Sequence, residues 1–219
     1  VIPVDDNGDL KIDEYKKLLN ARTKLVSIAH VSNAMGTVNP VNEIISLAHQ
    51  ARALVLIDGA QSAVHLDIDV RKMDCDFFAF SSHKLYGPTG IGALYAKRHL
   101  LESMPVFHGG GEMIREVSFE KTTYADLPYK FEAGTPNIAD TIALKAALDF
   151  TSSIGKQLIR DHENDLLLYA TLQLEQIRGL KIIGKAREKI SVISFVIEGT
   201  HPQDLGILLD NQGIAVRTG

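Results

Sequence analysis

The chain has 219 residues and a mass of 24.0 kDa, enough for one full domain and part of a second. Hydrophobic residues make up 45% and charged residues 23%, and the formal charge of −4 gives no electrostatic reason to expect nucleic acid or an anionic membrane as a partner. No apolar run approaches the length of a bilayer span. The single cysteine, Cys75, excludes an internal disulfide framework and favours a reducing, cytoplasmic compartment.

Three short apolar runs in the first 100 residues predict buried strands of a parallel sheet. They are Leu25–Val31, Leu54–Ile57 and Phe77–Phe80. A helix is predicted from about Pro40, and a fourth strand, Ala93–Ala96, follows the glycine-bearing turn of residues 87 to 92. Strands separated by helices or long crossovers indicate an α/β fold with a doubly wound, mainly parallel sheet.

The second half of the chain predicts a different arrangement. Residues 108 to 134 are polar and contain three consecutive glycines, so we expect a long loop with a functional role there. Beyond it the pattern predicts helices Asn137–Ser153, Lys156–Arg178 and Pro202–Asn211 and strands Leu180–Ile183, Ser191–Ile197 and Ile214–Arg217. We therefore expect a large domain over residues 1–148 and the start of a smaller α+β C-terminal domain over residues 149–219.

The most informative segment is Ser81-Ser82-His83-Lys84-Leu85-Tyr86-Gly87-Pro88, which follows one predicted strand. Its lysine, Lys84, stands 26 residues after an aspartate, Asp58, that ends another predicted strand. Pyridoxal phosphate (PLP) needs an amine for its aldehyde, a carboxylate for its ring nitrogen and donors for its phosphate. Taken alone, Lys84 is more often a surface lysine and Asp58 a turn aspartate. Because open α/β sheets bind ligands at the carboxyl ends of their strands, the combination predicts a PLP site.

Four further residues are candidate cofactor ligands. Gln61 would hydrogen-bond the phenolic oxygen of PLP, or it is simply a glutamine at a helix start. Ser81 and His83 would contact the phosphate, although each alone is more often a local turn residue. Thr135 precedes Pro136 at a helix start, where capping and phosphate binding use the same geometry.

Other residues give weaker signals. Asn33 would contact the cofactor ring oxygen or the substrate carboxylate, or serve as a turn residue. Arg217 would meet a substrate carboxylate with both guanidinium nitrogens, or be an edge-strand arginine. His30 is expected to be a satisfied interior histidine, and Cys75 to be structural and distant from the site. No metal site is predicted.

Five collinear stretches resemble the group II (SufS-type) cysteine desulfurases and selenocysteine lyases, within the class V aminotransferase family of fold-type I PLP enzymes. The similarity extends over the whole chain and corresponds to roughly the middle half of a family member. The stretches are His30-Val31-Ser32-Asn33 with Gly36-Thr37, Asp58-Gly59-Ala60-Gln61, Ser81 through Gly90, Phe131 through Asn137, and Gly213 through Gly219.

The resemblance implies a PLP-dependent transferase fold in which Lys84 binds the cofactor aldehyde and Asp58 pairs with the ring nitrogen. It likewise implies that Gln61 contacts the phenolic oxygen and that Ser81 and His83 bind the phosphate. In this family the threonine of Gly-Thr-Pro serves the phosphate of the neighbouring subunit. The matching residue, Thr135, therefore implies a homodimer with shared sites.

The chain also departs from the family pattern. Family members have an amino-terminal section whose histidine stacks on the PLP ring, and their Arg-Thr-Gly run leads into His-His-Cys, whose cysteine takes the substrate sulfur. The chain opens on Val1 and stops at Gly219, so neither feature is among its residues. We expect an internal piece of a longer protein, with little or no activity alone, and Cys75 does not occupy the position of the nucleophile.

For the parent protein the resemblance implies conversion of L-cysteine to L-alanine with an enzyme persulfide, and transfer of the sulfur to an acceptor protein for iron–sulfur cluster assembly in the cytoplasm. L-selenocysteine is an alternative substrate. Two other interpretations stay open. One is another class V enzyme, such as a kynureninase-like hydrolase or an epimerase, and the other is a non-catalytic scaffold subunit that keeps the PLP fold.

Overall fold

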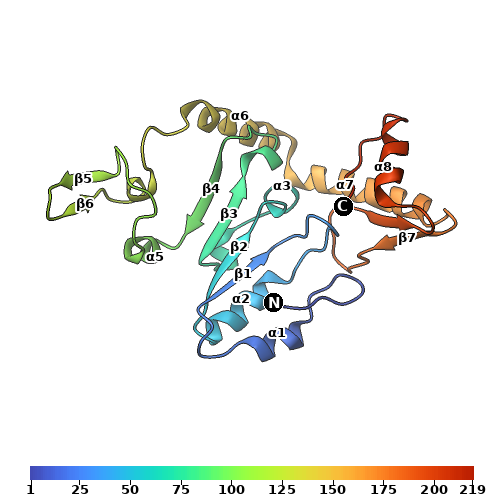
Figure 1. Ribbon diagram of the computed structural model, residues 1–219, viewed down its shortest axis with the longest axis horizontal. Coiled ribbons are helices and arrows are strands. Elements are labelled where there is room, and N and C mark those ends of the chain that lie inside the picture. The colour runs from blue at the N-terminus through green and yellow to red at the C-terminus, as the bar shows by residue number, and fades with distance from the viewer.

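A four-stranded sheet forms the centre of the computed structural model, which describes residues 1–219 (Figure 1). The strands lie in the order β1 (Leu25–Ala29), β2 (Leu54–Asp58), β3 (Phe77–Ser81) and β4 (Gly92–Ala96). β1, β2 and β3 pair in parallel, whereas β4 is antiparallel to β3. The predicted, mainly parallel α/β sheet is therefore confirmed, with β1 ending two residues earlier than expected.

Helix α2 (Val41–Gln50) covers one face of this sheet and confirms the helix predicted from Pro40. Its apolar residues recur at helical spacing, so one stripe of the helix faces inward. The buried members of this stripe are Val41, Ile44, Ile45 and Ala48. They join Val55 and Ile57 of β2 in the main hydrophobic core, which holds the first half of the chain together.

Five short helices precede or follow the strands of this sheet, and the sequence analysis did not predict their ranges. They are α1 (Ile12–Leu18), α3 (Ser62–His65), α4 (Val70–Met73), the 3-10 helix η1 (Ser82–Lys84) and α5 (Arg98–Ser103). Two of them matter for the site, because α3 and η1 begin just beyond the carboxyl ends of β2 and β3.

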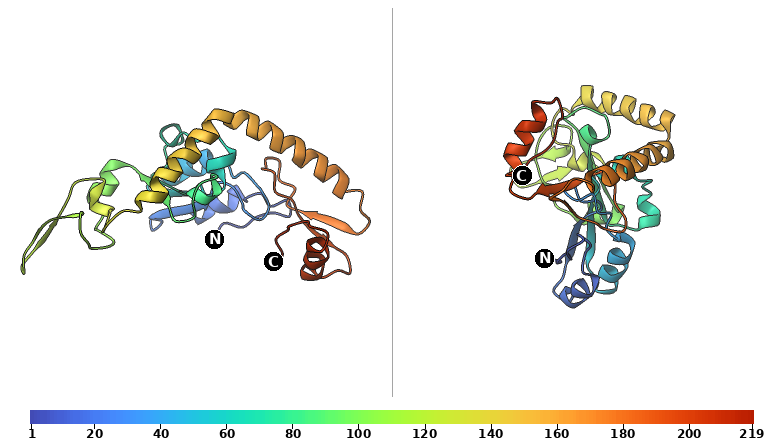
Figure 2. Two further views of the ribbon diagram at one scale, coloured as in Figure 1. Left: turned by 90° about the horizontal axis from the view of Figure 1, so that it is seen from above. Right: turned by 90° about the vertical axis from the view of Figure 1, so that its right-hand side faces the viewer.

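The prediction of a long loop over residues 108 to 134 is wrong, because this segment contains a β-hairpin. Strands β5 (Ile114–Val117) and β6 (Thr122–Tyr124) pair antiparallel, and the 3-10 helix η2 (Tyr129–Phe131) follows them. Both strands contain β-branched residues, which favour extended backbone despite the polar composition. The hairpin projects from one end of the molecule, away from the central sheet (Figures 1 and 2).

Two long helices, α6 (Ile138–Ile154) and α7 (Lys156–Leu174), run in succession across the molecule (Figure 2). Gly155 separates them with a φ of 88°, a conformation that favours glycine. The boundary proposed between residues 148 and 149 falls inside α6, and the division into two domains stays a prediction. Neither these helices nor any other in the chain is long and apolar enough to cross a membrane.

The last part of the chain is the predicted α+β piece. It contains the antiparallel strands β7 (Leu180–Ile183) and β8 (Ser194–Ile197) and the helix α8 (Pro202–Asp210). The strand predicted at Ile214–Arg217 is wrong. These residues are exposed, and the Ile214 N–H bonds the Leu209 carbonyl at 3.0 Å instead of a neighbouring strand.

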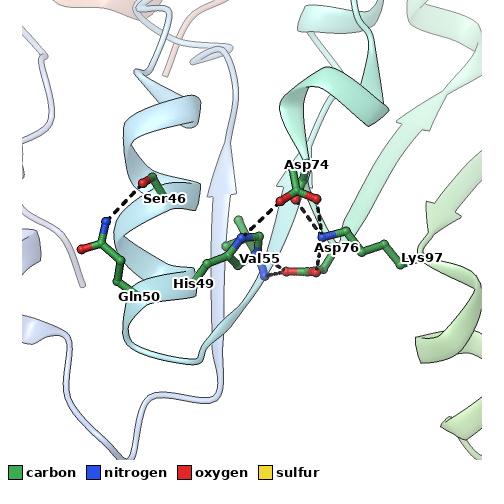
Figure 3. A network of polar contacts seen from close by, with 7 residues as sticks. All are labelled: Ser46, His49, Gln50, Val55, Asp74, Asp76 and Lys97. Carbon is green, nitrogen blue, oxygen red and sulfur yellow. Dashed lines mark hydrogen bonds and ion pairs between the residues drawn. The ribbon is translucent and has the colours of Figure 1, made fainter.

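A polar network joins four elements at the amino ends of β2 and β3 (Figure 3). The buried carboxylate of Asp76 accepts a hydrogen bond from the Val55 N–H at 2.7 Å and contacts His49 Nε2 at 2.8 Å and Lys97 Nζ at 3.0 Å. Lys97 also contacts Asp74 at 2.7 Å. Burial of Asp76 opposes its ionisation, but the hydrogen bonds from His49, Lys97 and Val55 outweigh it, so the pKa of Asp76 is lowered.

Candidate functional site

The carboxyl ends of β1, β2 and β3 meet at one edge of the sheet. In the strand register Ala29 lies opposite Asp58, and Asp58 lies opposite Ala79. Asp58 is therefore the last residue of the central parallel strand. The chain that continues from β1 carries Asn33, and the chain that continues from β3 carries Lys84, so side chains distant in sequence reach the same edge.

A cavity of about 350 Å³ opens at this edge, and four predicted site residues line it: Asn33, Asp58, Gln61 and Lys84. Its volume lies within the range of small-molecule sites. Thr37 also lines the cavity, and its buried hydroxyl has no hydrogen-bond partner in the protein. Buried polar atoms are normally paired, and this hydroxyl is an exception beside the cavity. An amine, a carboxylate and two side-chain amides converge here, a set of groups that fits PLP.

The turn after β2 fixes the approach of Asp58 and Gln61. One carboxylate oxygen of Asp58 accepts the Ala60 N–H at 2.9 Å, and the Gly59 N–H donates to the Ala79 carbonyl at 2.7 Å. A Cβ at Gly59 would stand 2.0 Å from the ring of Phe78, so only glycine allows this close approach. The turn thus holds an exposed carboxylate and a half-buried amide on the same cavity wall.

A tight turn holds Lys84 in place after β3. The Ser82 carbonyl accepts the Leu85 N–H at 2.8 Å and the Gly87 N–H at 3.0 Å, and Ser82 is fully buried. A Cβ at Gly87 would lie 2.0 Å from the Ser82 hydroxyl, which has no hydrogen-bond partner of its own. The turn therefore depends on glycine, and it leaves Lys84 half-buried in the cavity wall.

The predicted phosphate ligands do not line this cavity. Ser81 ends β3, His83 is exposed within η1, and Thr135 is exposed before α6. The N-cap of α6 is Asn137, not Thr135, and the Asn137 side chain donates to the Gly90 carbonyl at 3.1 Å. The segment that carries Thr135 is thus joined to the loop that follows Lys84, while the three phosphate roles stay predictions.

His30, Cys75 and Arg217 lie outside the cavity. His30 is interior as predicted, but it is not satisfied, because its Nδ1 has no partner. Burial lowers the pKa of His30 to about 4, so the ring is neutral. Cys75 stands between Asp74 and Asp76 in the sequence and is fully buried, and burial raises the pKa of its thiol to about 11. Arg217 is exposed near the carboxyl terminus, and its role in binding substrate stays a prediction.

The sequence did not predict that the amino-terminal turn also lines the cavity. Val4 and Leu10 form an isolated antiparallel bridge, and both contribute to the wall together with Gly8. The Asn7-Gly8 dipeptide is a standard turn signal and would have indicated this hairpin-like segment. Its position over β1 could not be obtained from the dipeptide alone.

Comparison with known proteins assigns the family. The sequence profile of the aminotransferase class-V family matches residues 1–219, the whole chain. The chain belongs to the class-V aminotransferase family. One relative is the cysteine desulfurase of Synechococcus elongatus, which is 53% identical to this chain over 219 residues. These residues are 100% of this chain and 35% of that protein.

Two solved structures share the fold. The cysteine desulfurase CsdA of Escherichia coli matches with a TM-score of 0.94 and 38% identity, over 99% of this chain and 54% of that one. A mutant of C-DES with glycine covalently linked to its PLP cofactor matches with a TM-score of 0.84 and 25% identity, over 97% of this chain and 57% of that one. The chain thus spans about a third to just over half of the length of these relatives.

Proposed function

We propose that the protein is a PLP-dependent cysteine desulfurase, which converts L-cysteine to L-alanine and retains the sulfur as an enzyme persulfide. The observation that carries the proposal is the convergence of Lys84, Asp58, Gln61 and Asn33 on one cavity at the carboxyl edge of the sheet. Relatives of the same family named cysteine desulfurases support it, since one is 53% identical over the whole chain.

Each cavity residue has a defined task in this proposal. PLP, when bound, supplies a ring that withdraws electrons from the substrate α-carbon. Lys84 Nζ holds the cofactor aldehyde before the substrate arrives and then takes the proton from the substrate Cα. The carboxylate of Asp58 keeps the ring nitrogen protonated, and the side-chain amide of Gln61 donates to the phenolic oxygen.

The remaining ligands complete the binding of cofactor and substrate. Ser81 and His83 would bind the phosphate, and Thr135 would serve the phosphate of a second subunit in a homodimer. Asn33 would contact the ring oxygen or the substrate carboxylate. Arg217 would pair with that carboxylate through two parallel hydrogen bonds.

The sulfur acceptor is proposed to be a protein of iron–sulfur cluster assembly in the cytoplasm, and L-selenocysteine is proposed as a second substrate. Within the longer protein, residues 1–148 would form the PLP-binding domain and residues 149–219 the start of the smaller domain. The lone, buried Cys75 is consistent with a reducing compartment.

Removal of the Cα proton can be tested without sulfur transfer. The protein loaded with PLP is incubated with L-cysteine or L-alanine in D₂O, and deuterium at Cα is measured by mass spectrometry. We expect exchange in the native protein and its loss in Lys84→Ala, whereas Lys72→Ala, on an exposed helix outside the cavity, serves as the control. Exchange that persists in Lys84→Ala, or that is absent from PLP-loaded native protein, would contradict the proposal.

A further inference from the structure

Helix α3 connects the cofactor cavity to the second half of the chain. Its N-cap residue, Gln61, lines the cavity, and its last residue, His65, contacts helix α7. α3 has only one turn, so a shift at His65 moves Gln61 with it. The position of α7 is therefore connected to the cavity through a short, rigid element.

The first contact between the two helices is a close pairing of the His65 ring with the Glu163 carboxylate. His65 Nδ1 lies 2.7 Å from Glu163 Oε2, and the two side chains are only 17% and 20% exposed. A pair that is this shielded from water is screened less than a surface ion pair, and loss of one partner leaves the other poorly solvated.

The second contact is made by Lys156, the first residue of α7. Its Nζ donates to the carbonyls of Ala63 and Leu66 at 3.0 Å each, so it satisfies the free carbonyls at the end of α3. Burial lowers the pKa of Lys156, while the nearby charge of Asp67 opposes this shift. Two charged side chains of α7 thus hold the end of α3 that points away from the cofactor cavity.

Apolar packing does not replace these polar contacts. α7 contains no buried residue, and a cavity of about 200 Å³ borders the joint, lined by both His65 and Glu163. Where close packing is incomplete, the position of a helix depends more strongly on its directed contacts. The contact with Glu163 is the side-chain hydrogen bond that orients His65.

We propose that His65 and Glu163 are positioning residues, which hold Gln61 in the cofactor cavity through helix α3. The proposal rests on the proposed function only in that Gln61 contacts the phenolic oxygen of PLP. Neither residue lines the cavity that holds Gln61, so their effect would be on the stability of α3 and on the cofactor environment. The orientation of the second half of the chain would in this way influence the PLP site.

The test compares Glu163→Gln with Glu175→Gln. Glu175 caps the other end of α7 and pairs with Lys185 at 2.8 Å, so its replacement removes the same charge and an ion pair without touching α3. Hydrogen exchange is measured first on the cofactor-free proteins. We expect Glu163→Gln to accelerate hydrogen exchange in residues 59–66 about tenfold and to leave exchange in α2 unchanged. In Glu175→Gln, exchange should be unchanged in both segments.

The second readout is the PLP-loaded protein. We expect Glu163→Gln to weaken PLP binding about threefold to tenfold and to shift the pH titration of the cofactor absorbance, because the phenolic oxygen loses an ordered donor. In a double-mutant cycle, His65→Ala combined with Glu163→Ala should be less harmful than the sum of the single changes.

The two proposals fail in different ways. If exchange in residues 59–66 is unaffected by Glu163→Gln, the positioning role is overturned whether or not PLP binds. If Glu163→Gln accelerates that exchange but leaves PLP affinity and absorbance unchanged, α3 is coupled to α7 but does not position Gln61 against the cofactor. That result also refutes the proposal. Absence of PLP binding in the native protein, together with a responsive α3, would refute the proposed function and leave the helix coupling supported.

Discussion

Replacement of Asp76 tests the polar network of Figure 3 most sharply. The Asp76→Ala change removes the acceptor of the Val55 N–H and the partner of His49 and Lys97. A buried donor left without a partner costs about 1–3 kcal/mol, and breaking a buried ion pair costs about 3–5 kcal/mol. His49 and Lys97 retain some access to water, with side chains 30% and 23% exposed, so we expect a loss of about 3 kcal/mol.

Asp74→Asn is the matched control. Asp74 contacts the same lysine, but its side chain is 65% exposed, and asparagine tolerates its positive φ of 58°. Its replacement should cost less than about 1 kcal/mol. The free energy of unfolding is measured by urea titration, with an unchanged m-value as the sign that only stability has changed. Equal losses in Asp76→Ala and Asp74→Asn would refute the assignment of the energy to the buried carboxylate.

The same network predicts a dependence on pH. Because the pKa of Asp76 is lowered in the folded protein, the unfolded chain takes up a proton at a higher pH than the native state. The stabilisation from Asp76 is therefore complete above the unfolded pKa of about 4 and is lost as the pH falls further. We expect the free energy of unfolding to fall less steeply below about pH 4 in Asp76→Ala, a variant in which Asp74, His49 and Lys97 are unchanged. The same dependence on pH in the variant and the native protein would contradict the assignment to Asp76.

Three other changes test individual residues. The pKa of His30 is lowered to about 4, so the free energy of unfolding should fall by up to about 3 kcal/mol between pH 6.5 and pH 4. His30→Asn should remove that loss when unfolding is measured as a function of pH. An unaltered pH profile in His30→Asn would show that the buried His30 ring is not the cause. The thiol of Cys75, whose pKa is raised to about 11, should react with iodoacetamide only after unfolding, so rapid labelling of the native protein would be inconsistent with its burial. Gly87→Ala should lower the melting temperature, and Ser82→Ala should recover part of the loss by removing the hydroxyl it meets; additive losses would rule out that clash.

The sequence predicted the elements whose signal is strong and local. Runs of apolar and β-branched residues gave β1, β2 and β3, and the inward stripe of α2 gave that helix, because burial on one face imposes a pattern on the sequence. Asp58 and Lys84 were predicted for the same reason, since Asp58 ends one such strand and Lys84 lies three residues beyond the end of another. Their convergence on one cavity follows from the rule that parallel strands present their carboxyl ends together.

The errors arose where pairing or tertiary contact decides the structure. Strand β5 is exposed along its whole length, so its sequence shows no inward stripe, and the three glycines before the hairpin favoured a loop. Ile214–Arg217 has the composition of a strand, but a strand needs a neighbour, and here the chain turns back on α8. The contact of His65 with Glu163 joins residues 98 positions apart, and no local pattern indicates it.

The central claim is that Lys84 carries the cofactor, and one measurement addresses it directly. The protein is incubated with PLP, reduced with borohydride and digested, and the pyridoxyl-modified peptide is identified by mass spectrometry. We expect a single modified lysine, Lys84, and loss of the adduct in Lys84→Ala. A modification at another lysine in native protein, or no adduct under conditions where PLP is bound, would contradict the site described here.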